Sequence, residues 1–228
     1  MGTKRRCVAA IGVVVIAAAS ACVGWAFNQP SADSSVEDLL QDRITYFDVD
    51  DIDGIWSVGS GSFAGYAVDE TLRGLNATVR GRTDSVSGQI DITDAHLVSA
   101  TIECNLADVH SNLKVRDDYF SHDVIDTEAY PTATFRTNEP VDLGELLEDT
   151  SAEMDQNALE VVIPGEVELN GKVVAAEANA ETVVTPHGIQ VNGSVPLVWS
   201  DFGVTPPETD IVSVADSGTL EFLLLLNR

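Results

Sequence analysis

Residues 159–184 read LEVVIPGEVELNGKVVAAEANAETVV, and they contain the clearest structural signal in the chain. Up to Leu169, apolar side chains alternate with glutamates, a pattern that is typical of a strand with one buried face. Asn170-Gly171 then separates this strand from a second alternating run. Because both central residues of a type I′ turn need positive φ, Asn-Gly is the preferred pair for a tight hairpin. The stretch therefore predicts two antiparallel strands joined by a tight turn.

The buried face of the second strand is a row of small side chains, which runs Val174, Ala176, Ala178, Ala180 and Val184. Alanines fill little volume. In a packed core they demand large residues opposite them, whereas inside a barrel they leave room for a ligand. The alternation alone fits both arrangements, and the three alanines are candidate lining residues of a cavity.

The same alternation recurs on both sides of this hairpin. Strand-like runs are expected at 56–61, 63–69, 76–82, 89–93, 96–106, 190–199 and 218–227. With the hairpin they make about nine or ten strands and little helix, which indicates a sandwich or a barrel. Hairpin connections and an even strand number favour closure, since a closed sheet has no exposed edges. We therefore expect an all-β antiparallel barrel over residues 48–228.

One strand of this barrel, residues 96–106, carries an apolar side chain at every second position. These inward-facing candidates are Val98, Ala100, Ile102, Cys104 and Leu106. Val98, Ala100, Ile102 and Leu106 are therefore expected to line the interior. Cys104 is expected to be a buried thiol, because no Lys, Arg or His neighbour in the sequence would lower its pKa.

Residues 111–137 interrupt the strand pattern. Pro131 has no amide proton, so this stretch cannot form a single regular element. Irregular helical spacing before Pro131 and a β-branched, aromatic run after it predict one short helical excursion that leads into a strand. In a barrel, residues 111–131 would form a flap over one mouth. The side chains expected to face the apolar interior are Leu113, Tyr119 and Phe120 from the flap and Phe135 from the following strand.

The N-terminal segment, residues 7–27, has no charged side chain and follows Lys4, Arg5 and Arg6. At about 1.5 Å per residue, a helix of this length spans a hydrocarbon core of roughly 30 Å. The positive-inside rule then places residues 1–6 in the cytoplasm and the rest on the outer face of the bacterial cytoplasmic membrane. Residues 28–47 would be an acidic tether between this transmembrane or signal helix and the barrel.

Two other fates of the N-terminal segment stay open. Ala19-Ser20-Ala21 fits the small-residue pattern of a signal-peptidase site, and with Cys22 it forms a weak lipoprotein box in which Cys22 is the lipidation candidate. We place an uncleaved anchor first, because the apolar run continues past Cys22 to Phe27. Anchor, lipoprotein and secreted protein all put the barrel outside the cytoplasm.

The charge balance is strongly acidic. The chain carries 12 Lys and Arg against 37 Asp and Glu, a net charge of −25, and three of the basic residues precede the apolar segment. Such a surface repels phosphate backbones and anionic lipid headgroups, which argues against nucleic acid as a partner and predicts that the domain stays off the bilayer surface.

Motifs of catalysis and metal binding are not seen. The chain has no G-x-S-x-G, and its four histidines are scattered with neither H-x-H nor H-E-x-x-H spacing. Aligning Gly54 with the sixth position of a calcium loop places Val49 at the first position and Ser60 at the twelfth, so both essential carboxylates are missing. Arg116-Asp117 is expected to be an ion pair that holds the flap. We therefore expect no enzyme, no metal and no covalent cofactor.

Several separated stretches resemble the bacterial YceI-like family. They are Trp56 with Gly65-Tyr66-Ala67-Val68, Val79 to Thr83, Arg116-Asp117, Tyr130 to Phe135, and Asp201-Phe202-Gly203. The resemblance covers roughly Ile55 to the C-terminus. It implies a lipocalin-like antiparallel barrel around an apolar tunnel for a long amphiphile, such as a polyisoprenoid, an isoprenoid quinone or a fatty-acid derivative.

The expected function is therefore non-covalent binding of a long apolar isoprenoid-type or fatty-acid-type lipid by a membrane-tethered barrel. The alternative is a non-enzymatic accessory subunit that docks on the outer face of a membrane complex, for instance a respiratory complex whose quinone would match the ligand class.

Overall fold

A computed structural model describes residues 52–144, 159–185 and 188–228 of the chain. All described residues belong to one compact unit. The predicted N-terminal helix (1–27), the tether (28–47) and Cys22 lie outside the described residues. Within the described ranges, no helix is long and apolar enough to cross a membrane.

The described unit is built on eleven strands with antiparallel pairing throughout. They are β1 (Gly54–Val58), β2 (Phe63–Leu72), β3 (Leu75–Thr83), β4 (Val86–Thr93), β5 (His96–Asn105), β6 (Thr132–Thr137), β7 (Val141–Asp142), β8 (Leu159–Leu169), β9 (Lys172–Thr185), β10 (Gly188–Val198) and β11 (Val212–Asn227). Eight of them (β1, β4, β5, β6, β8, β9, β10 and β11) form a closed ring, because β1 pairs with β4 on one side and β11 on the other. The predicted all-β antiparallel barrel is confirmed.

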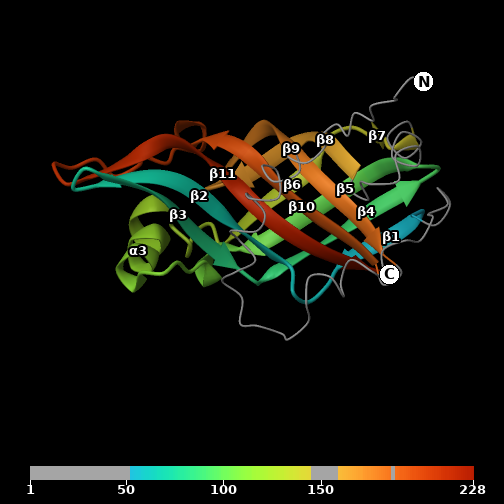
Figure 1. The fold of residues 1–228 in the computed structure, drawn as a ribbon, viewed down its shortest axis with the longest axis horizontal. Helices are drawn as coiled ribbons and strands as arrows, with labels where there is room; N and C mark the ends of the chain where they lie inside the picture. Colours follow the sequence, from blue (N-terminus) through green and yellow to red (C-terminus); the bar gives the residue numbers. More distant parts are fainter. Residues whose placement is uncertain (1–51, 145–158, 186–187) are drawn as a thin grey trace, which may run out of the picture. The chain divides into compact units, whose positions relative to one another are not determined.

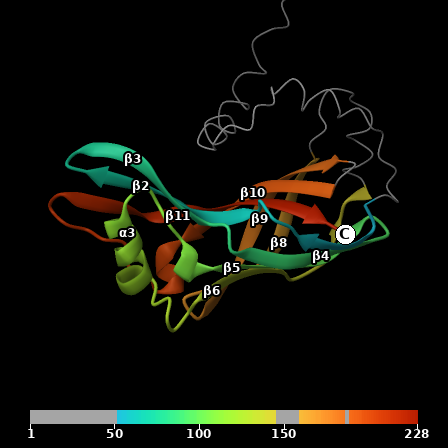
Figure 2. The ribbon, with the colours of Figure 1, turned by 90° about the horizontal axis from the view of Figure 1, so that it is seen from below.

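Two strands extend the ring. β2 pairs with the part of β11 from Val212 to Leu223, and β3 pairs with β2. Figures 1 and 2 show this β2–β3 hairpin and the start of β11 projecting past the ring, with α3 (Lys114–Tyr119) lying against them. We call this projection the arm.

The predicted hairpin at Asn170-Gly171 is confirmed. Leu169 pairs with Lys172, and both turn residues have positive φ, 53° at Asn170 and 70° at Gly171. Gly171 is also needed for space, since a Cβ there would lie 2.5 Å from the ring of Tyr130.

The register of β5 against β4 contains an irregularity that reverses one predicted orientation. Ser99 pairs with Asp91 while Leu97 pairs with Ile92, which leaves Val98 without a partner on β4. An extra residue in one strand shifts the alternation by one position. Leu97 is therefore buried at 4% exposure and Val98 is 43% exposed, so the prediction that Val98 faces the interior is wrong.

The segment between β5 and β6 is the predicted helical excursion. It comprises a short turn of helix (Leu106–Asp108), then α3, which continues directly into η3 (Phe120–Val124). We call residues 111–131 the flap.

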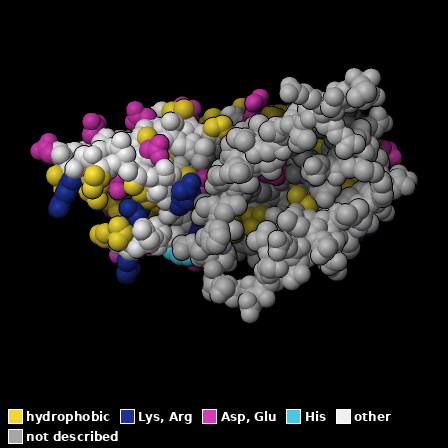
Figure 3. Space-filling view, in the orientation of Figure 1, with side chains coloured by type: hydrophobic (Ala, Val, Ile, Leu, Met, Phe, Trp, Pro, Cys, Tyr) yellow, Lys and Arg dark blue, Asp and Glu magenta, His cyan; other side chains and the backbone are white. Residues whose placement is uncertain are grey.

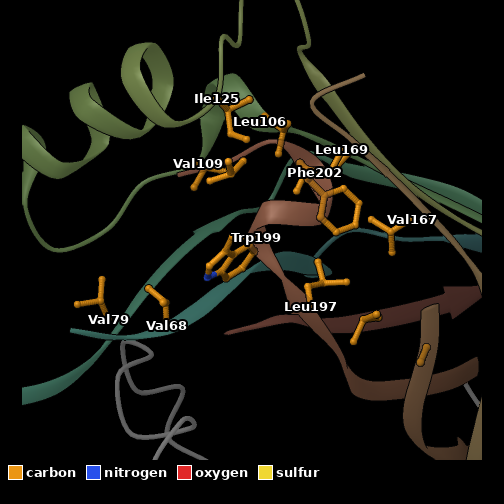
Figure 4. Close-up of a cluster of buried hydrophobic side chains, with 14 residues drawn as sticks. Val68, Val79, Leu106, Val109, Ile125, Val167, Leu169, Leu197, Trp199 and Phe202 are labelled. Atoms are coloured by element: carbon orange, nitrogen blue, oxygen red, sulfur yellow. The ribbon is translucent and has the colours of Figure 1, made fainter. Parts of the chain in front are cut away.

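Two clusters of buried apolar side chains fill the barrel. The first surrounds Trp199 and Phe202 of η4 (Trp199–Phe202), and Figure 4 shows these two rings packed among side chains from β8, β10, the flap and the segment before the flap. The second surrounds Trp56 and the C-terminal leucines of β11. Ile163 and Phe222 pack against both clusters, so the two cores meet at the middle of the barrel.

Candidate functional site: an apolar cavity between the two cores

An apolar cavity of about 90 Å³ lies inside the barrel where the two cores meet. Its lining comes from seven of the eight ring strands and from β2. The lining residues are Ala64, Ile90, Ala100, Ile102, Cys104, Ala133, Thr134, Phe135, Ile163, Val167, Ala178, Val191, Val195, Leu220, Glu221, Phe222 and Leu224.

Small side chains opposite larger ones create this space. Ala133 pairs with Cys104 across β5 and β6, and Ala178 pairs with Ile163 across β8 and β9. Ala178 is buried at 1% exposure. The side chains of Ala133 and Ala178 are too short to reach the opposite side of the barrel, so space remains between these two residue pairs.

Two phenylalanines bound the cavity because glycines in the neighbouring strands make room for their rings. A Cβ on Gly193 would lie 2.6 Å from Cζ of Phe222, and a Cβ on Gly165 would lie 2.6 Å from Cζ of Phe135. Each ring can therefore lie against the wall and leave the lumen open. Sequence reasoning missed Ala133, Phe222 and these two glycines, although a glycine inside a strand is a signal of such close approach.

The structure brings four of the predicted site residues together around the cavity: Ala100, Ile102, Phe135 and Ala178. Three others are buried or half-buried but belong to the cores on either side. Leu106 and Ala176 lie in the first cluster, and Ala180 lies in the second.

The flap residues differ from the expectation in part. Phe120 packs against the first cluster, with its ring stacked on Tyr66 at 5.4 Å between centroids. Leu113 and Tyr119 are 48% and 40% exposed, so their predicted inward orientation is wrong. Leu113 is the residue before the first helical turn, and Tyr119 is one position from Phe120, which on a helix turns its side chain about 100° away.

Polar contacts hold the flap to the arm. The guanidinium of Arg116 pairs with the Glu70 carboxylate at 3.6 Å, and both side chains are largely buried. Asp117 does not pair with Arg116; it accepts hydrogen bonds from the Ser111 amide (2.8 Å) and hydroxyl (2.6 Å). Burial raises the pKa of Tyr66 to about 12, an effect that Arg116 partly offsets. The flap is thus fastened by the Arg116–Glu70 ion pair, the stack of Phe120 on Tyr66 and the burial of Ile125 in the first cluster, while the Asp117–Ser111 contacts cap the helix locally.

Among the ionisable side chains that line the cavity, Cys104 is the most buried. Burial raises the pKa of its thiol to about 11, although a hydrogen bond with the Ala133 backbone acts in the opposite direction. At neutral pH the thiol is therefore uncharged and a weak nucleophile. Within the described ranges, no cluster of His, Cys, Asp and Glu is arranged to hold a metal ion.

A second concavity, about 560 Å³ in volume, is open to solvent, and its lining includes exposed side chains as well as buried ones such as Leu197 and Phe202. It lies where β9 and β10 separate, because their pairing ends at Asn179 and Ser194. Its lining mixes apolar side chains with the Arg80–Glu221 ion pair. Although it is larger, this groove is wet and partly charged, so the interior cavity suits an apolar chain better.

A closed antiparallel barrel with a dry, apolar interior and a helical flap belongs to the lipocalin-like class of barrels. The family model for the YceI-like domain matches residues 56–225, and the chain therefore belongs to the YceI-like family.

Solved structures share this fold. A polyisoprenoid-binding domain from Saccharophagus degradans, implicated in plant cell wall breakdown, superposes with a TM-score of 0.55 at 16% identity, covering 75% of this chain and 97% of that one. BcnA from Burkholderia cenocepacia superposes with a TM-score of 0.53 at 20% identity, covering 72% of this chain and 96% of that one. A comparison with curated proteins found no match.

Proposed function

We propose that this chain is an extracytoplasmic, membrane-tethered barrel that binds one long apolar lipid of the isoprenoid or fatty-acid type without a covalent bond. The observation that carries the proposal is the apolar cavity at the junction of the two cores, whose lining is almost free of polar groups. The fold is that of a polyisoprenoid-binding domain, which supports the same ligand class.

The size of the cavity defines what binding would require. Sites for small molecules enclose about 300–1,000 Å³, so a space of about 90 Å³ takes only a short length of chain. A longer chain would have to displace side chains that line the cavity, and Ile163 and Phe222, which pack against both cores, are among them. Each methylene that enters contributes about 0.8 kcal/mol, so about ten methylenes would contribute roughly 8 kcal/mol before the cost of this rearrangement.

The cellular placement rests on the N-terminal sequence. Residues 7–27 would anchor the barrel on the outer face of the cytoplasmic membrane with residues 1–6 inside, or Cys22 would carry an acyl chain. Mass analysis of the mature N-terminus separates these forms.

The ligand is tested by solvent extraction of the natively purified protein and mass spectrometry of the extract. One lipid per chain is expected, and an extract without lipid would overturn the proposal.

A matched pair of variants locates the site. Ala178→Phe places a ring in the cavity and should abolish co-purifying lipid, while Ala175→Phe, on the outer face of the same strand, should leave it unchanged. Ala178→Val should give a graded loss, which keeps the test useful if the larger variant does not fold. If Ala175→Phe removes the lipid instead, the ligand lies in the solvent-open groove that Ala175 lines, and the interior site is wrong.

A further inference from the structure

Three apolar side chains stand exposed at the tip of the arm. Leu72 and Leu75 flank the turn between β2 and β3 and are 43% and 75% exposed. Ile211 is 55% exposed and lies beside them, because its carbonyl oxygen accepts a hydrogen bond of 2.8 Å from the Arg73 amide. No described side chain of the barrel covers this tip.

The flap adds a second exposed apolar group at the same end. Val115 of α3 is 75% exposed, and Leu113 before it is 48% exposed. The Arg116–Glu70 ion pair fixes α3 to β2 two residues from Leu72, and Figures 1 and 2 both show α3 against the arm. The exposed apolar side chains of the arm tip and of the flap therefore lie on elements that contact each other.

The charges around these side chains are mixed. Arg73 forms the turn itself, and Lys114 precedes Val115, but Lys114 pairs with Asp118 at 2.7 Å and Asp210 precedes Ile211. In Figure 3 the end of the molecule that carries the arm shows hydrophobic side chains interspersed with both signs of charge. Because the chain as a whole is strongly acidic and repels anionic headgroups, docking at this end would depend on apolar insertion and not on charge attraction.

We propose that the arm tip and α3 rest on a lipid bilayer, with Leu72, Leu75, Ile211 and Val115 inserted at the boundary of headgroups and acyl chains. This inference rests on the proposed tethering and lipid binding. The apolar side chains stand on a hairpin turn, a loop and a helix, and exposed apolar groups of this kind can be buried at the boundary of headgroups and acyl chains.

The length of chain before the barrel supports the same occupant. Residues 28–51 separate the apolar segment from the first described residue, and these 24 residues span at most about 80 Å when fully extended. These residues lead into β1, which lies at the end of the barrel away from the arm (Figure 1). If residues 7–27 lie in the bilayer, the tether keeps the barrel near the membrane and is long enough for the tip to reach it, so weak insertion could dock it. Docking would bring the flap to the membrane surface, and a lipid could enter the barrel without crossing water.

The test uses the full chain reconstituted in vesicles of phosphatidylcholine and phosphatidylglycerol, with Cys7, Cys22 and Cys104 replaced by alanine. An environment-sensitive dye is attached to one new cysteine at a time, introduced by Leu75→Cys or Val115→Cys. Matched controls carry the dye through Ile55→Cys or Val162→Cys, which are exposed to a similar degree (59% and 53%) on β1 and β8.

The dyes at Leu75 and Val115 should shift to the blue and lose most of their emission when the acyl chains carry a nitroxide quencher, whereas the two control dyes should not. Equal quenching at all four sites, or none at Leu75 and Val115, would overturn the docking proposal. Extraction of bound lipid from the unlabelled protein reports separately on ligand binding, so failure of docking is distinguishable from failure of the proposed function.

Discussion

The ring of Phe222 lies directly over Gly193, its cross-strand partner on β10. A Cβ at Gly193 would stand 2.6 Å from the ring and would also meet the backbone carbonyl of Asn179. Tyr66 lies over its own partner Gly81 in the same way, so a glycine opposite an aromatic residue recurs in this barrel. The glycine lets the ring lie against the wall, which keeps the lumen open beside it.

Gly193→Ala is therefore expected to push the Phe222 ring into the cavity. The variant should bind less lipid, measured by mass spectrometry of the extract, and should lose about 1–3 kcal/mol of unfolding free energy in urea because the site becomes overpacked. Ser194→Ala, the next residue on the same strand, is the control and should change neither quantity. Full lipid content in Gly193→Ala would show that the position of Phe222 does not limit the cavity.

Cys104 offers a direct readout of occupancy, because its thiol lines the cavity. In a background in which Cys7 and Cys22 are serine, alkylation by iodoacetamide at pH 7.5 should be slow and should accelerate about tenfold per pH unit, since the thiol has its pKa raised to about 11. Protein freed of lipid should react faster than loaded protein at every pH. Equal rates for the two forms would place the lipid away from Cys104.

Local sequence signals were sufficient for the hairpin of β8 and β9, because Asn170-Gly171 and the alternation around it specify the turn and the buried face together. They could not place Val98. Its orientation follows from an extra residue in β5 opposite Asp91 and Ile92 on β4, and this mismatch exists only once the two strands are paired. Alternation within one strand carries no information about it.

The same limit applies to the alanine row of β9. Ala176, Ala178 and Ala180 were correctly assigned to one face, but only Ala178 lines the cavity. The cavity lies between the two cores, so the alanine that lines it depends on how far each core extends along the barrel. The extent of the cores depends on residues far away in the sequence, such as Phe202 and Trp56.

Alkaline pH should destabilise the fold through Cys104. Its pKa is raised from 9.0 to about 11, so the thiol contributes stability that is complete below pH 9 and is lost as the pH rises through 11. Tyr66 acts in the same direction from pH 10 to about 12. Between pH 9 and 10, the free energy of unfolding measured in urea should therefore fall by on the order of 1 kcal/mol in the native chain. In Cys104→Ala it should fall much less. Parallel pH curves for the two proteins would contradict this assignment.

The last prediction concerns the fastening of the flap. Arg116→Ala removes the cation that pairs with Glu70, and because these side chains are only 20% and 15% exposed, the variant should lose about 1–3 kcal/mol of unfolding free energy. If the flap covers the route of the lipid, exchange of a fluorescent fatty acid should also become several-fold faster in stopped-flow measurements, because the flap opens more often. Lys114→Ala is the control on the same helix. Its pair with Asp118 is 85% and 59% exposed and therefore screened by solvent, so its removal should leave both the unfolding free energy and the exchange rate unchanged. An exchange rate that stays constant in Arg116→Ala while stability falls would mean that the ion pair only supports the fold and that lipid enters elsewhere.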